Sequence, residues 1–183
     1  MRIVITAGHG GKDPGAVSDY DKDGNAEYTE STFCADMRNY VAYYLRNRGY
    51  RVETDGQGPT NAPLPQAIAL AQGADIAIEF HLNASVNHKA EGIEVLTNPR
   101  NKLLAQKIAR AIRDVTDSPL RGDGGFKVES SGQHSRLGFV RAGGLVVELE
   151  FVSNKARMQV LNDKRWLVAK SIAEAIMNHI GGK

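Results

Sequence analysis

Two kinds of hydrophobic pattern alternate along the chain. Short, almost continuously apolar and β-branched runs, typical of strands covered on both faces, occupy residues 2–6, 50–54, 74–81, 92–97 and 145–151. Longer segments with apolar residues every three or four positions, typical of amphipathic helices, occupy residues 30–48, 63–72, 101–116 and 162–180. This alternation predicts a single α/β domain with a central, mostly parallel sheet flanked by helices on both faces.

Two stretches, 8–29 and 117–139, follow neither pattern. The first is rich in Gly, Asp and Asn, and the second contains clusters of Gly and Ser. Long loops in a compact domain tend to carry function. In open α/β sheets ligands bind beyond the carboxyl ends of the strands, so we expect a site there.

Composition and charge narrow the choice of partners. The 23 Lys and Arg residues nearly balance the 21 Asp and Glu residues, and the net charge is +2. Because no Lys/Arg stripe forms, we expect no nucleic-acid partner. No apolar stretch approaches the length of a membrane span, so no integral membrane association is expected. The one cysteine, Cys34, lies in a helical pattern and is interpreted as a small packed residue.

No signal peptide is recognisable at the start of the sequence. Met1 leads directly into the first apolar run, which is too short for a secretory signal and is better explained as a strand. We therefore expect synthesis in the cytoplasm without a signal of its own. If the protein works elsewhere, another agent has to deliver it.

Reactive side chains gather where strands are predicted to end. His9 follows the first strand, His81 closes the strand at 74–81, and Glu148 and Glu150 lie in the last strand. Glu30 begins the helix at 30–48, on the helical face that is directed towards the sheet. A carboxylate at a helix N-terminus is also stabilised by the helix dipole alone, which is the structural alternative for Glu30.

Two histidines and one glutamate are a known ligand set for catalytic zinc. A zinc hydrolase also needs a separate carboxylate that takes and gives protons. Glu148 is the candidate, because a carboxylate in an otherwise apolar strand is costly without a partner or a purpose. Glu150 shares its strand face by the two-residue period, and Glu79 has the same parity as His81, so spacing alone does not choose among them.

Four segments carry a resemblance to a known family. The string TAGHGGKDPGA at 6–16, Glu30 at the start of a helix, IEFHLNAS at 78–85 and VVELEFVSN at 146–154 occur in the family's order. Together they resemble the zinc-dependent N-acetylmuramoyl-L-alanine amidases of the amidase-3 family, over essentially the whole chain. The resemblance implies that His9, Glu30 and His81 bind Zn²⁺ and that Glu148 is the catalytic glutamate.

The chain departs from the family's pattern at several positions. Glu150 stands where the family usually has glycine, and Glu79 where it usually has a small residue such as serine. Both are expected to add negative charge near the site. The stretch 117–139 resembles the family poorly except at Arg121-Gly122. Glu27 competes with Glu30 as the ligand, although the family's helix register fits better when counted from Glu30.

Three further histidines are weaker candidates. His88 lies in a polar loop and is expected to be solvated. His134 lies in a Gly/Ser loop and is a candidate for the rim of the substrate site. His179 lies at a helix C-terminus, where a partly charged imidazole is stabilising.

The resemblance implies one catalytic domain over residues 1–183. Its expected reaction is hydrolysis of the amide between N-acetylmuramic acid and L-alanine in peptidoglycan, by a monomer acting on the cell wall or periplasm. The missing signal peptide and second domain favour a phage or prophage endolysin that reaches the wall through a membrane lesion. The alternatives are a zinc peptidase or carboxypeptidase acting within the stem peptide, and a non-catalytic wall-binding module.

Overall fold

A six-stranded sheet forms the centre of the computed structural model, which describes residues 1–129 and 137–182. Its strands are β1 (Ile3–Ala7), β4 (Val52–Thr54), β5 (Ile76–Asn83), β6 (Glu94–Leu96), β7 (Phe126–Lys127) and β8 (Leu145–Phe151). Their spatial order is β4-β1-β5-β8-β6-β7. The first four strands in this order are parallel, and β6 joins β8 antiparallel. The predicted single α/β domain with a mostly parallel sheet is therefore confirmed.

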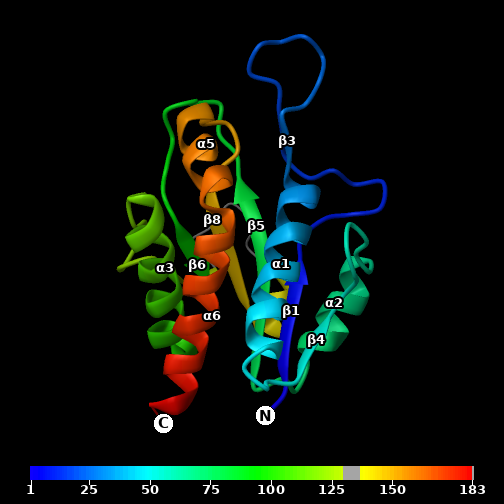
Figure 1. Ribbon diagram of the computed structural model, residues 1–183, viewed down its shortest axis with the longest axis vertical. Coiled ribbons are helices and arrows are strands. Elements are labelled where there is room, and N and C mark those ends of the chain that lie inside the picture. The colour runs from blue at the N-terminus through cyan, green and yellow to red at the C-terminus, as the bar shows by residue number, and fades with distance from the viewer. Residues whose placement is uncertain (130–136, 183) are drawn as a thin grey trace.

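Helices cover the two faces of the sheet unequally. The helices are α1 (Glu30–Arg46), α2 (Leu64–Ala71), α3 (Lys102–Thr116), α4 (Gly138–Arg141), α5 (Lys155–Asp163) and α6 (Arg165–Gly181), with a short 3-10 helix at Pro99–Asn101. Figure 1 shows the long helices α1, α3 and α6 side by side on one face. The short helices α2 and α4 contact each other and pack on the other face of the sheet.

The alternation of side chains along each strand builds one core on each face. In β1, Ile3 and Ile5 belong to the large core under α1, α3 and α6, whereas Val4 belongs to a smaller core with residues of α2 and α4. The same alternation places Ala77 and Val146 in the smaller core. Since α2 has eight residues and α4 four, this face is thinly covered and leaves room for a cavity.

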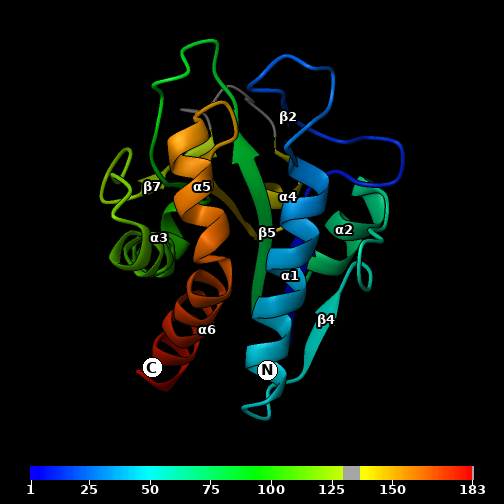
Figure 2. The ribbon, with the colours of Figure 1, turned by 45° about the horizontal axis from the view of Figure 1, so that its top comes forward.

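The parallel strands direct their carboxyl ends, and the long loops that follow, towards one end of the molecule. Figure 1 shows these loops at the top and both termini at the opposite end. Figure 2 tips this top end towards the viewer. Across residues 1–129 and 137–182, no helix combines the length and the apolar character that crossing a membrane requires.

The structure corrects some predicted boundaries. The predicted helix at 162–180 is preceded by a separate helix, α5, and the two are divided at Lys164. The side chain of Asn154 caps α5 by accepting a hydrogen bond from the backbone N–H of Arg157. The stretch 8–29 contains a small hairpin of β2 (Val17–Ser18) and β3 (Tyr28–Thr29), and 117–139 contains β7 and the start of α4.

Candidate metal centre

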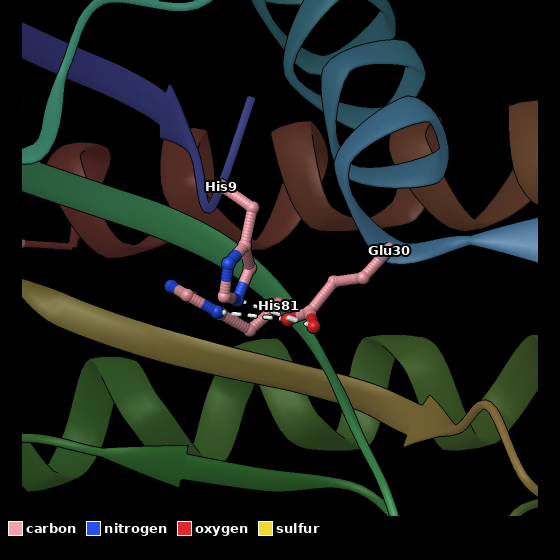
Figure 3. A group of neighbouring side chains, drawn as sticks. All are labelled: His9, Glu30 and His81. Carbon is pink, nitrogen blue, oxygen red and sulfur yellow. Dashed lines mark hydrogen bonds and ion pairs between the residues drawn. The ribbon is translucent and has the colours of Figure 1, made fainter. Parts of the chain in front are cut away.

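Three side chains from distant segments meet at the carboxyl end of the sheet. His9 follows β1, Glu30 opens α1 and His81 lies in β5. Figure 3 shows both imidazole rings directed at the Glu30 carboxylate. Nε2 of His9 lies 3.2 Å from one oxygen of Glu30, and Nδ1 of His81 lies 2.9 Å from the other. The potential ligand atoms of the three residues all lie within 4.8 Å of one another.

The backbone at His9 is unusual for a residue with a side chain. Its φ of 62° lies in the left-handed region, which costs about 1–3 kcal/mol and persists only where the surroundings enforce it. Asn61 holds the His9 carbonyl through a 2.6 Å hydrogen bond. The fully buried Arg38 donates to the Asn61 side chain and pairs with Asp55 at 3.1 Å. The turn that presents His9 is thus anchored to α1.

The carboxylate of Glu30 is buried and held by backbone as well as by the histidines. It accepts hydrogen bonds from the N–H groups of Ala16, at 2.8 Å, and Leu82, at 3.0 Å. Burial opposes its charged form, yet hydrogen bonds from the two histidines hold the pKa of Glu30 well below its ordinary value. The rival carboxylate, Glu27, is exposed and accepts from the N–H of Tyr20 instead.

The two histidines respond to the same carboxylate. The hydrogen bond that His9 donates to Glu30 raises the pKa of His9 to about 9, against desolvation and with a further contribution from Asp13. Desolvation lowers the pKa of His81, but its hydrogen bonds to Glu30 and Glu79 outweigh this and raise the pKa well above the ordinary value. Without a metal, the Glu30 carboxylate therefore favours the protonated form of both histidines.

The donor set fits zinc. Two imidazole nitrogens and one carboxylate are the protein ligands found at several catalytic zinc sites. Donors about 2.0–2.2 Å from a tetrahedral zinc lie roughly 3.3–3.6 Å apart, close to the 2.9 and 3.2 Å distances between the histidine nitrogens and Glu30. Nδ1 of His9, which faces away from Glu30, lies 2.9 Å from Asp13, as an outer partner of a ligating imidazole would.

Glu148 lies beside this cluster on the neighbouring strand. It is paired in register with His81 and lines the same cavity. Among the described residues, its Oε2 is buried and has no hydrogen-bond partner. Burial raises the pKa of Glu148 to about 7, helped by the charge of Glu30 and opposed by that of His81. A carboxyl group in this state can hold or release a proton near neutral pH.

The structure distinguishes the two competitors of Glu148, which are Glu150 and Glu79. Glu150 is 1% exposed and accepts hydrogen bonds of 2.6 Å from the N–H of Gly92 and the hydroxyl of Ser118. Glu150 does not line the cavity, so the two-residue period of the strand, by which it shares a face with Glu148, does not bring it to the site. The pairing of β5 with β8 shifts register between His81 and Asn83, close to Glu150. Glu79 does line it, with Oε1 3.1 Å from Nε2 of His81.

Two cavities of about 470 Å³ each meet at the cluster. The two cavities share four lining residues, which are His9, Leu64, Glu79 and His81. The first continues over the thinly covered sheet face towards Glu148 and Phe139, and the second runs under the loop that begins at Gly10. The candidate ligands therefore lie in the middle of an extended cleft.

Other candidates lie outside the cluster or outside the described residues. His88 is exposed, with Nδ1 3.0 Å from the carbonyl oxygen of Ser153, and Cys34 is buried as expected. His134, the candidate rim residue, lies outside the described residues. Sequence reasoning missed Glu94, a buried cavity residue opposite Glu148 that pairs with Arg121 at 2.6 Å. The signal available in the sequence was a carboxylate within the apolar run at 92–97.

Comparisons with known proteins agree with this geometry. The model of a family described as N-acetylmuramoyl-L-alanine amidase, Amidase_3, matches residues 3–178. A solved structure from Neisseria meningitidis, described as an N-acetylmuramoyl-L-alanine amidase, is 44% identical, covers 98% of this chain and 96% of its own, and has a TM-score of 0.89. The catalytic domain of CwlV, an N-acetylmuramoyl-L-alanine amidase from Bacillus (Paenibacillus) polymyxa, is 25% identical with a TM-score of 0.82, covering 100% of this chain and 99% of its own.

A curated relative is longer than this chain. A Staphylococcus aureus protein described as an autolysin is 26% identical over 99% of this chain, which spans 39% of that protein's length. The family match nevertheless covers nearly every residue that builds the sheet and the cleft. The chain therefore belongs to the amidase-3 family of N-acetylmuramoyl-L-alanine amidases.

Proposed function

We propose that this chain is a zinc-dependent hydrolase that cuts the amide between the lactyl group of N-acetylmuramic acid and the first L-alanine of the peptidoglycan stem peptide. The observation that carries the proposal is the convergence of His9, Glu30 and His81 in a chain that matches the amidase family over residues 3–178. The cleft on both sides of the cluster gives room for the two arms of such a substrate, the glycan and the peptide.

In this proposal His9, Glu30 and His81 hold the metal, and Glu148 moves the proton. Zinc at such a site acts as a Lewis acid that polarises a carbonyl and acidifies water. Glu148 takes a proton from the attacking water and later gives it to the leaving amine, acting first as a general base and then as a general acid. The unpartnered Oε2 of Glu148 is the atom that would hold this proton.

The direct test is digestion of purified peptidoglycan, with the released fragments identified by mass spectrometry. The proposal expects peptides that begin with L-alanine, new α-amino groups and no new reducing sugar ends. Metal analysis of the purified protein should find about one zinc per chain, as the three-ligand site requires. Undiminished zinc in both the His9→Ala and His81→Ala proteins would refute the ligand assignment.

The same digestion separates the alternatives. A peptidase within the stem peptide would release peptides that begin at a later stem residue, and a glycosidase would raise reducing ends, using a pair of carboxylates without metal. A non-catalytic wall-binding module would bind sacculi and release nothing. The Oε2 atom of Glu148, which is buried and has no hydrogen-bond partner among the described residues, favours turnover over simple binding.

We further propose that residues 1–183 act as the catalytic domain, as a monomer, on cell-wall peptidoglycan. The role as a phage or prophage endolysin stays a prediction from the sequence. It expects lysis when the protein gains access to the wall through a membrane lesion and no lysis while the membrane is intact. Sedimentation of the purified protein tests the monomer.

A further inference from the structure

His81 lies between two carboxylates. Its Nδ1 faces Glu30 at 2.9 Å, and its Nε2 faces Glu79 at 3.1 Å. Glu79 precedes His81 by two residues in β5, so both side chains lie on the same face of the strand. Glu79 is 3% exposed and lines both cavities that meet at the candidate metal centre.

The Glu79 carboxylate lies next to Thr6 of the neighbouring strand, β1. Thr6 of β1 is paired in register with Glu79, and its buried hydroxyl lies 3.4 Å from both Oε2 of Glu79 and the carbonyl oxygen of Ile78, either of which can accept its proton. The other carboxylate oxygen, Oε1, is the one that faces His81. Glu79 therefore lies between the Thr6 hydroxyl of β1 and the imidazole of His81.

The backbone of Gly8 also restricts the position of the His81 ring. A Cβ on Gly8 would lie only 2.2 Å from Cε1 of His81, so the ring packs directly on the Gly8 backbone. In a histidine that binds a metal, one ring nitrogen is the ligand, and the other carries the proton and donates it to an outer partner such as a carboxylate. Beside Glu79 that nitrogen is Nε2, and the nitrogen left for a metal is Nδ1, which is directed at the cluster.

We propose that Glu79 is a positioning residue that keeps the proton on Nε2 of His81 and directs Nδ1 at the metal. This inference rests on the proposed zinc site and adds a residue beyond the three candidate ligands and Glu148. Outer carboxylates of this kind change metal affinity by about 10- to 100-fold when they are removed. Glu79 thus makes the zinc site of this chain tighter than a serine at the same position would.

The test compares zinc dissociation constants, measured by competition with a chelator, in four proteins. Relative to wild type, Glu79→Ser should bind zinc about 10- to 100-fold more weakly. Glu79→Gln, which keeps the shape and one acceptor oxygen but can also donate, should lie between them. Glu150→Gln is the matched control, because Glu150 is equally buried yet contacts Gly92 and Ser118 rather than a histidine.

A second readout reports the histidine directly. In ¹⁵N NMR spectra of the zinc-loaded wild type, His81 should carry its proton on Nε2. This preference should weaken in Glu79→Gln. If Glu79→Ser fails to fold, the Glu79→Gln spectrum alone tests the role of Glu79. Wild-type affinity in Glu79→Ser, or an equal loss in Glu150→Gln, would overturn the role of Glu79 while the zinc site stands. Absence of zinc binding by the wild type would overturn both proposals.

Discussion

A single methyl group at Gly8 should disable the site although no candidate ligand is replaced. In Gly8→Ala the new Cβ would lie 2.2 Å from Cε1, 2.5 Å from Nε2 and 2.6 Å from Nδ1 of His81, whereas ordinary contacts begin at 3.4 Å. The imidazole therefore has to move by about 1.2 Å, the difference between 3.4 and 2.2 Å. Overpacking of this kind destabilises a fold by about 1–3 kcal/mol, and a 1 Å misplacement of a reacting group costs roughly a hundredfold in rate.

Three measurements on the purified Gly8→Ala protein check this reasoning. Thermal unfolding gives the stability, metal analysis gives the zinc content, and kcat on purified peptidoglycan gives the rate. Gly181→Ala is the control, since a Cβ there meets no atom within 4 Å and should change none of the three. A Gly8→Ala protein with wild-type zinc content and rate would refute the proposed contact between His81 and the Gly8 backbone, and with it the role of His81.

Three further predictions address the carboxylates and the protons. Glu148→Gln should keep its zinc and its fold but lose roughly a hundredfold or more in kcat, the scale of proton-transfer catalysis; a normal rate would exclude Glu148 as the acid/base group. Because the pKa of His9 is about 9 without metal, zinc has to displace its proton, so zinc affinity should rise from about pH 6 to pH 9. Calorimetry in buffers of different ionisation enthalpy should count protons released at pH 7, and none released would contradict the charged state of the histidines. Glu150→Gly leaves the buried donors of Gly92 and Ser118 without their acceptor, so unfolding should become easier by about 1–3 kcal/mol while kcat per folded molecule stays unchanged. A loss of kcat in Glu150→Gly that is as large as in Glu148→Gln would show that the wrong glutamate was chosen.

The sheet and the long helices were predictable because their signals are local. The apolar runs at 2–6 and 145–151 locate β1 and β8, and the helical stripe from residue 30 locates α1. The rule that ligands gather at strand ends, joined to the family resemblance, selected His9, Glu30 and His81. The structure brings these three together, although their role as zinc ligands stays a prediction.

The contacts that hold the candidate ligands were beyond the reach of periodicity. The parity argument placed Glu150 beside Glu148 and failed, because the pairing of β5 with β8 shifts register after His81. The hydrogen bond from Asn61 to the His9 carbonyl depends on a loop that shows no periodic pattern. Such contacts depend on how loops pack against helices and strands. The distances between the contacting atoms do not follow from the spacing of residues in a single sequence.

The position of the two chain ends has a practical consequence. Both lie at the end of the molecule opposite the long loops that follow the parallel strands (Figure 1), whereas the cleft is lined by residues at the carboxyl ends of these strands. A tag, an affinity module or a solid support joined to either terminus would leave the cleft facing outwards. Attachment to a bead through the start of β1 or through the end of α6 should therefore preserve access for an insoluble polymer. The fold suits immobilised use from both ends without redesign of its loops.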